Sequence, residues 1–245
     1  MQTSFVLKKL SILIPCYNEE QYVWRVLQRV LDVPLCYDIE KEIIIINDGS
    51  TDQTQKEIDN FIASHAGCCV KSIEHPSNKG KGACIKSALP RATGDIIVVQ
   101  DADLEYDPND FNLMLQPIIE GRADAVFGSR FRGSGPHRGP FILHKIVNKV
   151  YTFLSNILTQ QNLTDIHTCY KMYRKEILLG ITLRENRFGI DPEIVAKLGH
   201  QKNTRIVEVG ISYYGRNFAE GKKISWGDGI RALYCIIKYN IFQKK

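Results

Sequence analysis

Long hydrophobic segments are absent from this sequence of 245 residues. No apolar run approaches the roughly 18–20 residues that a helix needs to cross a bilayer, and residues 1–9 lack the apolar core of a signal peptide. The seven cysteines show no paired C-x-x-C spacing of the kind that binds zinc. These absences predict a protein that is neither exported nor membrane-spanning by its own sequence, with free thiols in a reducing compartment such as the cytoplasm.

Two common nucleotide-binding signatures are also missing. The sequence has no phosphate-loop motif, in which a glycine precedes Gly-Lys-Ser/Thr by a short spacer. Gly80 and Gly82 form a Gly-x-Gly pair, but Ile85 stands where a dinucleotide fingerprint needs its third glycine. Rossmann dehydrogenases and P-loop ATPases are therefore disfavoured, and a bound nucleotide must be held by side chains and a metal instead.

Charge is nearly balanced overall but unevenly distributed. The 32 basic and 27 acidic side chains leave a formal charge of +5, which is too small an excess to indicate nucleic-acid binding. Residues 130–164 contain no acidic residue, and residues 141–159 and 224–241 have the pattern of amphipathic helices. The basic residues in and beside the acid-free segment are Arg130, Arg132, Arg138, Lys145 and Lys149. Such helices can lie in an anionic membrane interface, or they can pack on the domain or on a second subunit.

Strand and helix patterns alternate along most of the chain. Short apolar or β-branched runs predict strands at residues 11–15, 42–47, 70–74, 95–100, 123–128 and 205–213, with helical patterns between the first five. Alternation of this kind is typical of a doubly wound, mostly parallel sheet with helices on both faces. The predicted fold class is therefore α/β, in a single domain that ends in a C-terminal amphipathic helix.

Polar side chains follow three of the predicted strands. Tyr17 and Glu19 follow the first strand, Asp48 follows the second, and Asp101, Asp103 and Glu105 follow the fourth. Ligands of open parallel sheets bind at the carboxyl ends of the strands. A single Asp-x-Asp is usually a solvated turn or a helix cap, but several carboxylates on one edge repel each other unless a cation is bound. Because Mg²⁺ and Mn²⁺ prefer oxygen ligands and bridge carboxylates to phosphates, we expect such an ion at Asp101, Asp103 and Glu105 with a nucleotide diphosphate.

Five ordered motifs extend this interpretation. They are PCYNEE at 15–20, NDGSTD at 47–52, NKGKG at 78–82, DAD at 101–103 and GSR at 128–130. Together they resemble glycosyltransferase family 2, in the branch that contains the dolichol-phosphate mannose and glucose synthases. The resemblance implies a GT-A fold and an inverting, metal-dependent transfer of a hexose from a UDP- or GDP-sugar to a polyprenyl (dolichyl or undecaprenyl) phosphate.

The same resemblance implies roles for individual residues. Residues about 8–130 would bind the donor, and residues about 131–245 would face the acceptor and the membrane. The implied base and ribose pocket is Pro15, Tyr17, Glu19, Ile46 and Asp48. The implied diphosphate and metal site is Asp101, Ala102 and Asp103, with Glu105 as a further metal ligand. Arg130 resembles the family arginine at a donor or acceptor phosphate, and Arg216 with Lys222 resembles a late basic pair on a loop over the diphosphate.

The acceptor side depends on a second set of motifs. Residues 164–171, TDIHTCYK, resemble the acceptor motif of the family, in which Asp165 positions the acceptor or, for a hydroxyl acceptor, acts as base. We interpret His167 as structural and Asp191 as a carboxylate that stabilises a helix N-terminus. Glu193 is an acceptor-site candidate.

Three other functions remain open on the sequence alone. The chain could transfer sugar to a soluble or cell-wall hydroxyl, or bind nucleotide-sugar without catalysis. A nucleotidyltransferase is a third reading, although the sequence lacks its glycine-rich loop after the first strand. The leading expectation is a cytoplasmic protein held at the cytoplasmic face of a membrane by peripheral contact or by a membrane-protein partner. It would bind no nucleic acid.

Overall fold

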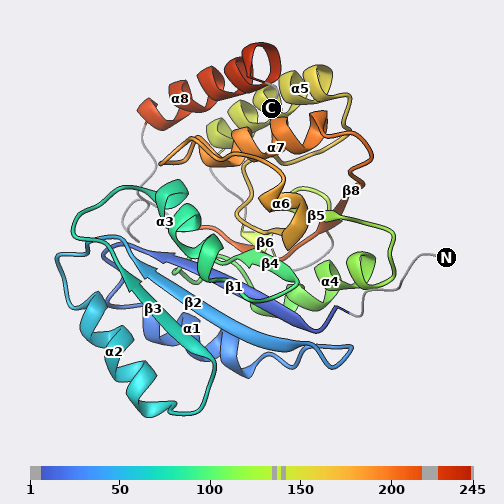
Figure 1. Cartoon of the computed structure of the whole chain (residues 1–245). Coiled ribbons are helices and arrows are strands. Elements are labelled where there is room, and N and C mark those ends of the chain that lie inside the picture. Colours follow the sequence, from blue (N-terminus) through green and yellow to red (C-terminus); the bar gives the residue numbers. More distant parts are fainter. Residues whose placement is uncertain (1–6, 134–136, 139–141, 217–225, 244–245) are drawn as a thin grey trace.

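The computed structural model describes residues 7–133, 137–138, 142–216 and 226–243, and its centre is a seven-stranded sheet. The strand order is β3-β2-β1-β4-β7-β5-β8 (Figure 1). The strand bounds are β1 Lys9–Cys16, β2 Glu40–Asn47, β3 Val70–Glu74, β4 Ile96–Val99, β5 Ala125–Ser129, β7 Lys171–Arg174 and β8 Ile206–Gly210. All neighbours pair in parallel except β7, which is antiparallel to both β4 and β5. This sheet confirms the predicted α/β fold class.

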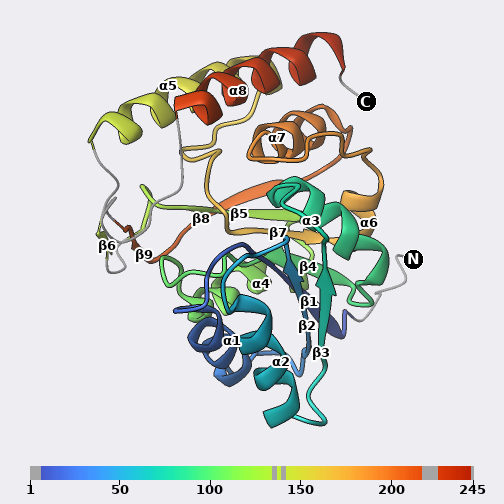
Figure 2. The same cartoon turned by 90° about the vertical axis from the view of Figure 1, so that its left-hand side faces the viewer.

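Helices cover both faces of the sheet. The helix bounds are α1 Val23–Asp32, α2 Thr54–Ser64, α3 Lys81–Ala88, α4 Phe111–Ile119, α5 Ile142–Thr159, α6 Lys175–Leu179, α7 Ile190–His200 and α8 Trp226–Ile237. Figure 2 shows α1, α2 and α4 on one side of the sheet and α3 and α7 on the other. Helices α5 and α8 run side by side as an outer layer over α7. These late helices therefore cover one side of the functional site that is described below.

The central strands form because their apolar residues are buried on both faces. Ile12 of β1 lies opposite Ile43 of β2 and Val98 of β4, and all three side chains are at most 1% exposed. Parallel strands covered by helices on both faces read as continuous β-branched runs, as the four consecutive isoleucines of β2 do. This buried centre fixes where the strands end, and so where the polar residues after them lie.

Strand β7 was not predicted. The strand has only four residues, KMYR, and two of them are charged, so it shows neither an apolar run nor a clear alternation. Met172 nevertheless pairs with Val98 of β4 and Val126 of β5. The predicted strand 205–213 is also shorter than expected, because β8 ends at Gly210 and Tyr213–Tyr214 form β9 with β6, His137–Arg138.

The two predicted amphipathic helices are present within the described residues. The first is α5, and the second is α8, which continues as a π-helix over Lys238–Phe242. Residues 224 and 225, with which the second prediction began, lie outside the described residues. None of the described helices combines the length and the apolar character needed to cross a membrane.

Candidate active site

A cavity of about 430 Å³ opens at the carboxyl ends of β1, β2 and β4. Nearly all of the residues expected to bind the donor line it: Pro15, Tyr17, Glu19, Asp48, Asp101, Ala102, Asp103, Glu105 and Arg216. We call this the donor-side cavity. Ile46 is different, because its side chain is fully buried in the hydrophobic core. Lys222 lies outside the described residues.

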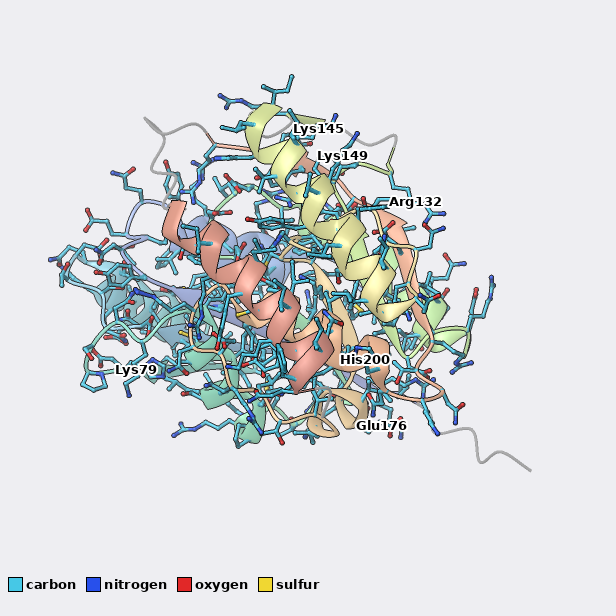
Figure 3. All side chains as sticks on the ribbon, turned by 90° about the horizontal axis from the view of Figure 1, so that it is seen from above. Lys79, Arg132, Lys145, Lys149, Glu176 and His200 are labelled. Atoms are coloured by element: carbon cyan, nitrogen blue, oxygen red, sulfur yellow. The ribbon has the colours of Figure 1, made fainter. Side chains whose placement is uncertain are left out.

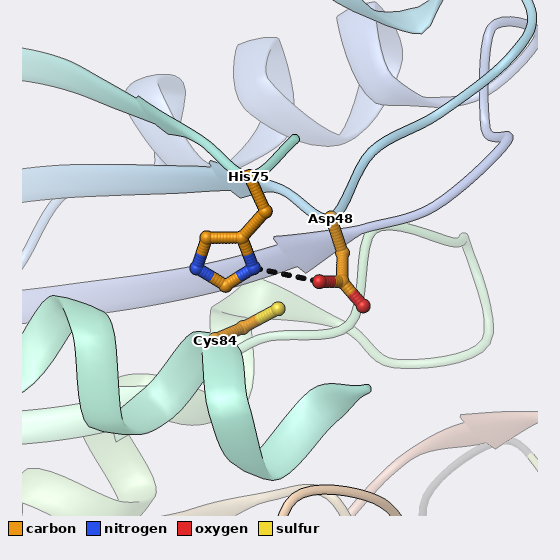
Figure 4. A group of neighbouring side chains, drawn as sticks. All are labelled: Asp48, His75 and Cys84. Carbon is orange, nitrogen blue, oxygen red and sulfur yellow. Dashed lines mark hydrogen bonds and ion pairs between the residues drawn. The ribbon is translucent and has the colours of Figure 1, made fainter. Parts of the chain in front are cut away.

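Asp48 is held in one orientation by several hydrogen bonds, and Figure 4 shows the one from His75. Its Oδ1 accepts from His75 Nδ1 at 2.7 Å and from the Lys79 backbone N–H at 3.0 Å. Its Oδ2 accepts from the backbone N–H of Gly80 at 2.6 Å, and His75 Nε2 lies 2.9 Å from Ser87 Oγ. Burial alone would raise the pKa of Asp48, but these hydrogen bonds outweigh burial and lower the pKa. Asp48 is therefore a fixed, ionised acceptor at the wall of the cavity.

Asp48, His75 and Cys84 also have ligand atoms within 4.8 Å of one another, which is compact enough to hold a metal ion. Their present contacts favour a hydrogen-bonded network instead. Both ring nitrogens of His75 are engaged, and burial raises the pKa of the Cys84 thiol well above its ordinary value. Since a metal binds the thiolate and not the thiol, the ion would have to displace both a hydrogen bond and a tightly held proton.

The expected metal ligands form an acidic rim, which we define as Asp101, Asp103 and Glu105. Two cations neutralise this rim: Lys81 Nζ lies 2.8 Å from Asp101 Oδ1, and an Arg216 guanidinium nitrogen lies 2.5 Å from Asp103 Oδ2. Glu105 accepts the Arg216 backbone N–H at 2.7 Å and the Tyr213 hydroxyl at 2.8 Å.

The electrostatics of the rim fit a divalent cation. Burial, together with the negative charges of Asp101 and Glu105, raises the pKa of Asp103 to about 7, and the charge of Arg216 only partly offsets this increase. Three hard oxygen donors whose mutual repulsion is incompletely relieved are a suitable set for Mg²⁺ or Mn²⁺. The residues present therefore fit the ion that the sequence led us to expect.

A second cavity of about 310 Å³ lies on the other side of the acidic rim. Its walls come from Asp101 and Glu105 of the rim, from Arg130, and from apolar residues of α5 such as Leu143 and Val147. We call this the acceptor-side cavity. Phe188, which precedes α7, lines both cavities. The two spaces therefore meet at the rim.

Arg130 and Asp165 form a buried, bidentate ion pair. Arg130 Nε and Nη2 donate to Asp165 at 2.7 and 2.9 Å, and Asn148 of α5 donates to the same carboxylate at 2.8 Å. Burial would raise the pKa of Asp165, but the charge and hydrogen bonds of Arg130, with that of Asn148, outweigh burial and lower the pKa to about 2. Arg130 lines the acceptor-side cavity, whereas Asp165 is fully buried and fixes Arg130.

Two acidic residues of α7 have contacts that the sequence did not indicate. Asp191 lies in the first turn of the helix, as expected, although the N-cap position is Gly189; it also accepts from Lys171 Nζ at 2.6 Å and lines the acceptor-side cavity. Glu193 is fully buried, and it accepts the backbone N–H groups of Arg184 and Glu185 at 2.8 and 2.7 Å. Glu193 is therefore a structural anchor and not an acceptor-site residue.

The structure places three further residues at the site, which are His167, Lys81 and His75. His167 lines the acceptor-side cavity, its Nε2 is buried without a hydrogen-bond partner, and burial lowers its pKa to about 4, so the ring is neutral. Sequence reasoning gave no role to Lys81 or His75. Lys81 belongs to the motif NKGKG at 78–82, which was the available signal, whereas nothing near His75 in the sequence indicates its contact with Asp48.

The chain matches known proteins over most of its length. Residues 11–181 match the family Glycosyl transferase family 2. The chain is 27% identical over 214 residues to a dodecaprenyl-phosphate galacturonate synthase of Rhizobium johnstonii, covering 87% of this chain and 61% of that protein. It is 27% identical over 238 residues to a dolichol-phosphate mannosyltransferase of Pyrococcus furiosus, covering 94% and 64%. The chain thus spans less than two thirds of the length of these two relatives.

Solved structures show the same fold at low sequence identity. A glucosyl-3-phosphoglycerate synthase from Mycobacterium tuberculosis in complex with UDP superposes with a TM-score of 0.72 at 15% identity, covering 95% of this chain and 80% of that one. The complex with Mn²⁺, UDP-glucose and phosphoglyceric acid gives 0.71 at 16%, with the same coverage. The family match includes the acidic rim, Arg130 and Asp165. The chain belongs to glycosyl transferase family 2.

Proposed function

We propose that this glycosyltransferase moves a hexose from a nucleotide diphosphate sugar to a polyprenyl phosphate, with inversion at the anomeric carbon and with the help of Mg²⁺ or Mn²⁺. One observation carries the proposal. The acidic rim lies where the donor-side cavity meets a second cavity, and the walls of this second cavity combine apolar residues of α5 with the largely buried Arg130. A charged donor on one side and a lipid phosphate on the other match this division. The names of the curated relatives favour the same acceptor class.

On the donor side, Asp48 and the strand ends bind the nucleotide and the rim binds its diphosphate. The fixed carboxylate of Asp48 accepts an N–H from the base or a hydroxyl from the ribose. A divalent cation bound at the rim neutralises the charge that develops on the departing diphosphate. Arg216 adds a planar cation to the same cavity, where it suits phosphate oxygens.

On the acceptor side, Arg130 binds the phosphate of the lipid. An oxygen of this phosphate attacks the anomeric carbon from the face opposite the donor diphosphate, and the electron pair of the breaking C–O bond leaves with the diphosphate. A phosphate acceptor is already an anion near neutral pH, so no general base is needed. The low pKa of Asp165 and its complete pairing with Arg130 and Asn148 support a positioning role for this residue.

Helices α5 and α8 provide the surface for the membrane. Their outward sides carry an exposed apolar set, in which Phe153 is 66% and Ile230 is 73% exposed. Lys145 and Lys149 lie on α5 with Arg132 nearby (Figure 3). An apolar helix face edged by lysine and arginine binds an anionic lipid surface. We propose that this face holds the protein at the cytoplasmic side of a membrane, where a membrane-protein partner would meet the same helices.

The central test is a transfer assay. A panel of UDP- and GDP-sugars is incubated with Mn²⁺ or Mg²⁺, with and without short-chain polyprenyl phosphate, for the wild type, Asp103→Ala and the control Asp38→Asn on an exposed loop. We expect lipid-dependent transfer that Asp103→Ala abolishes and Asp38→Asn leaves intact. Donor binding without a lipid product would redirect the search to hydroxyl acceptors or to a binding role, and pyrophosphate release would identify a nucleotidyltransferase.

The membrane contact has its own test. Flotation with vesicles that contain anionic lipid is compared between the wild type, Phe153→Ser and Lys149→Glu, with Lys56→Glu on α2 as a charge-matched control on a distant helix. We expect both α5 variants to bind less and the control to bind as the wild type does. Equal binding of all four proteins would refute the assignment of this face.

A further inference from the structure

We propose that Lys81 is a further catalytic residue of this transferase. Its ammonium lies between the two phosphate groups and permits them to approach each other. The inference rests on the proposed function, because it requires an anionic acceptor. It concerns a residue for which neither the motifs nor the comparisons give a role.

The backbone holds Lys81 in a fixed place. Lys81 is the first residue of α3, directly after Gly80, whose φ of 98° is in the left-handed region that favours glycine. A Cβ on Gly80 would lie 2.6 Å from the Asn186 carbonyl oxygen, and a Cβ on Gly82 would lie 2.4 Å from the Glu185 carbonyl oxygen. The two glycines thus let the start of α3 pack at backbone distance on the segment before α7. The Cα of Lys81 cannot shift without breaking this contact.

The side chain of Lys81 is enclosed and charged. It is 11% exposed and its Nζ lies 2.8 Å from Asp101 Oδ1. A lysine ammonium is an ordinary cation at neutral pH, and Lys81 acts here as a charge and not as an acid.

Lys81 lies at the boundary of the two cavities and lines both of them. Four residues line both cavities: Lys81, Asp101, Glu105 and Phe188. Among the residues that the structure describes, Lys81 is the only cation of the four. Arg216 lines the donor-side cavity alone and Arg130 lines the acceptor-side cavity alone. Lys81 therefore lies where the path of the sugar passes from one cavity to the other.

The chemistry needs a cation at this boundary. The donor diphosphate and the acceptor phosphate are both anions, and an acceptor oxygen must reach the carbon that carries the diphosphate. Repulsion between these anions opposes the approach. A divalent cation held by the rim would weaken the hold of Asp101 on the ammonium of Lys81, which would then contact phosphate oxygens at the boundary. A bond forms from the acceptor oxygen to the anomeric carbon, the C–O bond to the diphosphate breaks, and Lys81 offsets negative charge on both sides.

The test compares an anionic acceptor with a neutral one in the same protein. Transfer to short-chain polyprenyl phosphate and hydrolysis of the donor by water are measured for the wild type, Lys81→Met, Lys81→Arg and Lys79→Met. Lys79 is exposed in the same loop and is the matched control. We expect Lys81→Met to lower kcat/KM for lipid transfer about 100-fold, as loss of one charge-stabilising donor does, and hydrolysis less than about tenfold. Lys81→Arg should recover part of the transfer, and Lys79→Met should behave as the wild type does.

Binding of Mn²⁺ by electron paramagnetic resonance provides a readout that is independent of turnover. Because Lys81 competes with the ion for Asp101, we expect Lys81→Met to bind Mn²⁺ at least as tightly as the wild type, with an unchanged thermal unfolding midpoint. Equal losses of transfer and hydrolysis, weaker Mn²⁺ binding, or wild-type transfer by Lys81→Met would each overturn the role of Lys81. Absence of lipid transfer by the wild type itself would overturn the proposed function, and the acceptor role of Lys81 with it.

Discussion

Replacement of Asp165 by asparagine isolates the charge that holds Arg130 in place. The substitution keeps the shape of the side chain and removes the carboxylate that Arg130 binds through Nε and Nη2. Asp165 is fully buried and the Arg130 side chain is only 13% exposed, so water cannot replace the lost charge. The variant therefore retains a buried cation without its partner.

The magnitude follows from the pKa of Asp165. A fall from its ordinary value of 3.8 to about 2 corresponds to about 2.5 kcal/mol of free energy of unfolding, at about 1.4 kcal/mol per pKa unit. Leaving a buried charge unpaired typically costs about 3–5 kcal/mol in total. We therefore expect Asp165→Asn to lose about 3–5 kcal/mol at pH 7, and to lose lipid transfer because Arg130 is no longer oriented.

The depressed pKa of Asp165 determines how its contribution to the free energy of unfolding changes with pH. The folded-state pKa of Asp165 is depressed, so its stabilisation is complete above the unfolded pKa of 3.8 and is lost as the pH falls through about 2. Urea unfolding followed by circular dichroism at pH 7, 5 and 3 measures this contribution. The gap between the wild type and Asp165→Asn should be about 1 kcal/mol narrower at pH 3 than at pH 7.

Two results would refute this reasoning about Asp165. One is a loss below about 1 kcal/mol at pH 7, which is the range of an exposed ion pair. The other is a gap that does not change between pH 7 and pH 3. The double variant Arg130→Gln with Asp165→Asn serves as control, because it should be less destabilised than the sum of the two single variants by more than about 1 kcal/mol.

Three other predictions concern the donor side, the packing of α3 and the thiols. His75→Ala should weaken UDP or GDP binding several-fold in calorimetry, because Asp48 loses the side chain that orients it; binding equal to that of the wild type would refute this positioning role. Gly82→Ala should be destabilised by more than about 2 kcal/mol in urea unfolding, since its Cβ would meet the Glu185 carbonyl oxygen at 2.4 Å, whereas Gly229→Ala, with nothing within 4 Å, should not be. Maleimide should label the native protein at the exposed thiols before the buried ones, and equal rates at all seven would contradict the burial pattern. The exposed cysteines are Cys36, Cys68 and Cys69.

The sequence predicted the parallel part of the sheet well because burial on both faces leaves a direct signal. Residues 42–47 were predicted as a strand from their β-branched run, and β2 is Glu40–Asn47. Strand β7 left no such signal. Lys171 is buried there only because Asp191, 20 residues away in the sequence, neutralises it. A strand whose stability depends on a distant ion pair cannot be recognised from its own residues.

The same distinction explains the residues of the site. Motif residues that follow strands, such as Tyr17 and Asp101, lie around the donor-side cavity because the fold alone determines where strand ends meet. Their roles remain predictions. Asp191 does lie in the first turn of α7, as expected, but nothing in the sequence indicates its contact with Lys171, since an acidic residue there suits the helix dipole equally well whether or not a lysine faces it. Only the tertiary structure shows whether a lysine faces the carboxylate.

The three cations of the site differ in how firmly their acidic partners hold them. Asp165 is fully buried and receives hydrogen bonds from Asn148 as well as Arg130, so Arg130 is part of the scaffold. The Asp101 side chain that binds Lys81 is 28% exposed and lies on the rim where a metal is expected.

The acidic partners of Arg216 hold it less firmly than Asp165 holds Arg130 and more firmly than Asp101 holds Lys81. Arg216 contacts Asp103 and Glu105 of the rim, and binding of a divalent cation to those carboxylates would weaken both contacts. Binding of a metal at the rim would therefore free two cations, Arg216 on the donor side and Lys81 at the boundary, and would leave Arg130 in place. Because each freed cation needs a new anion, occupation of the rim by a metal should increase the affinity for phosphate groups on both sides of it.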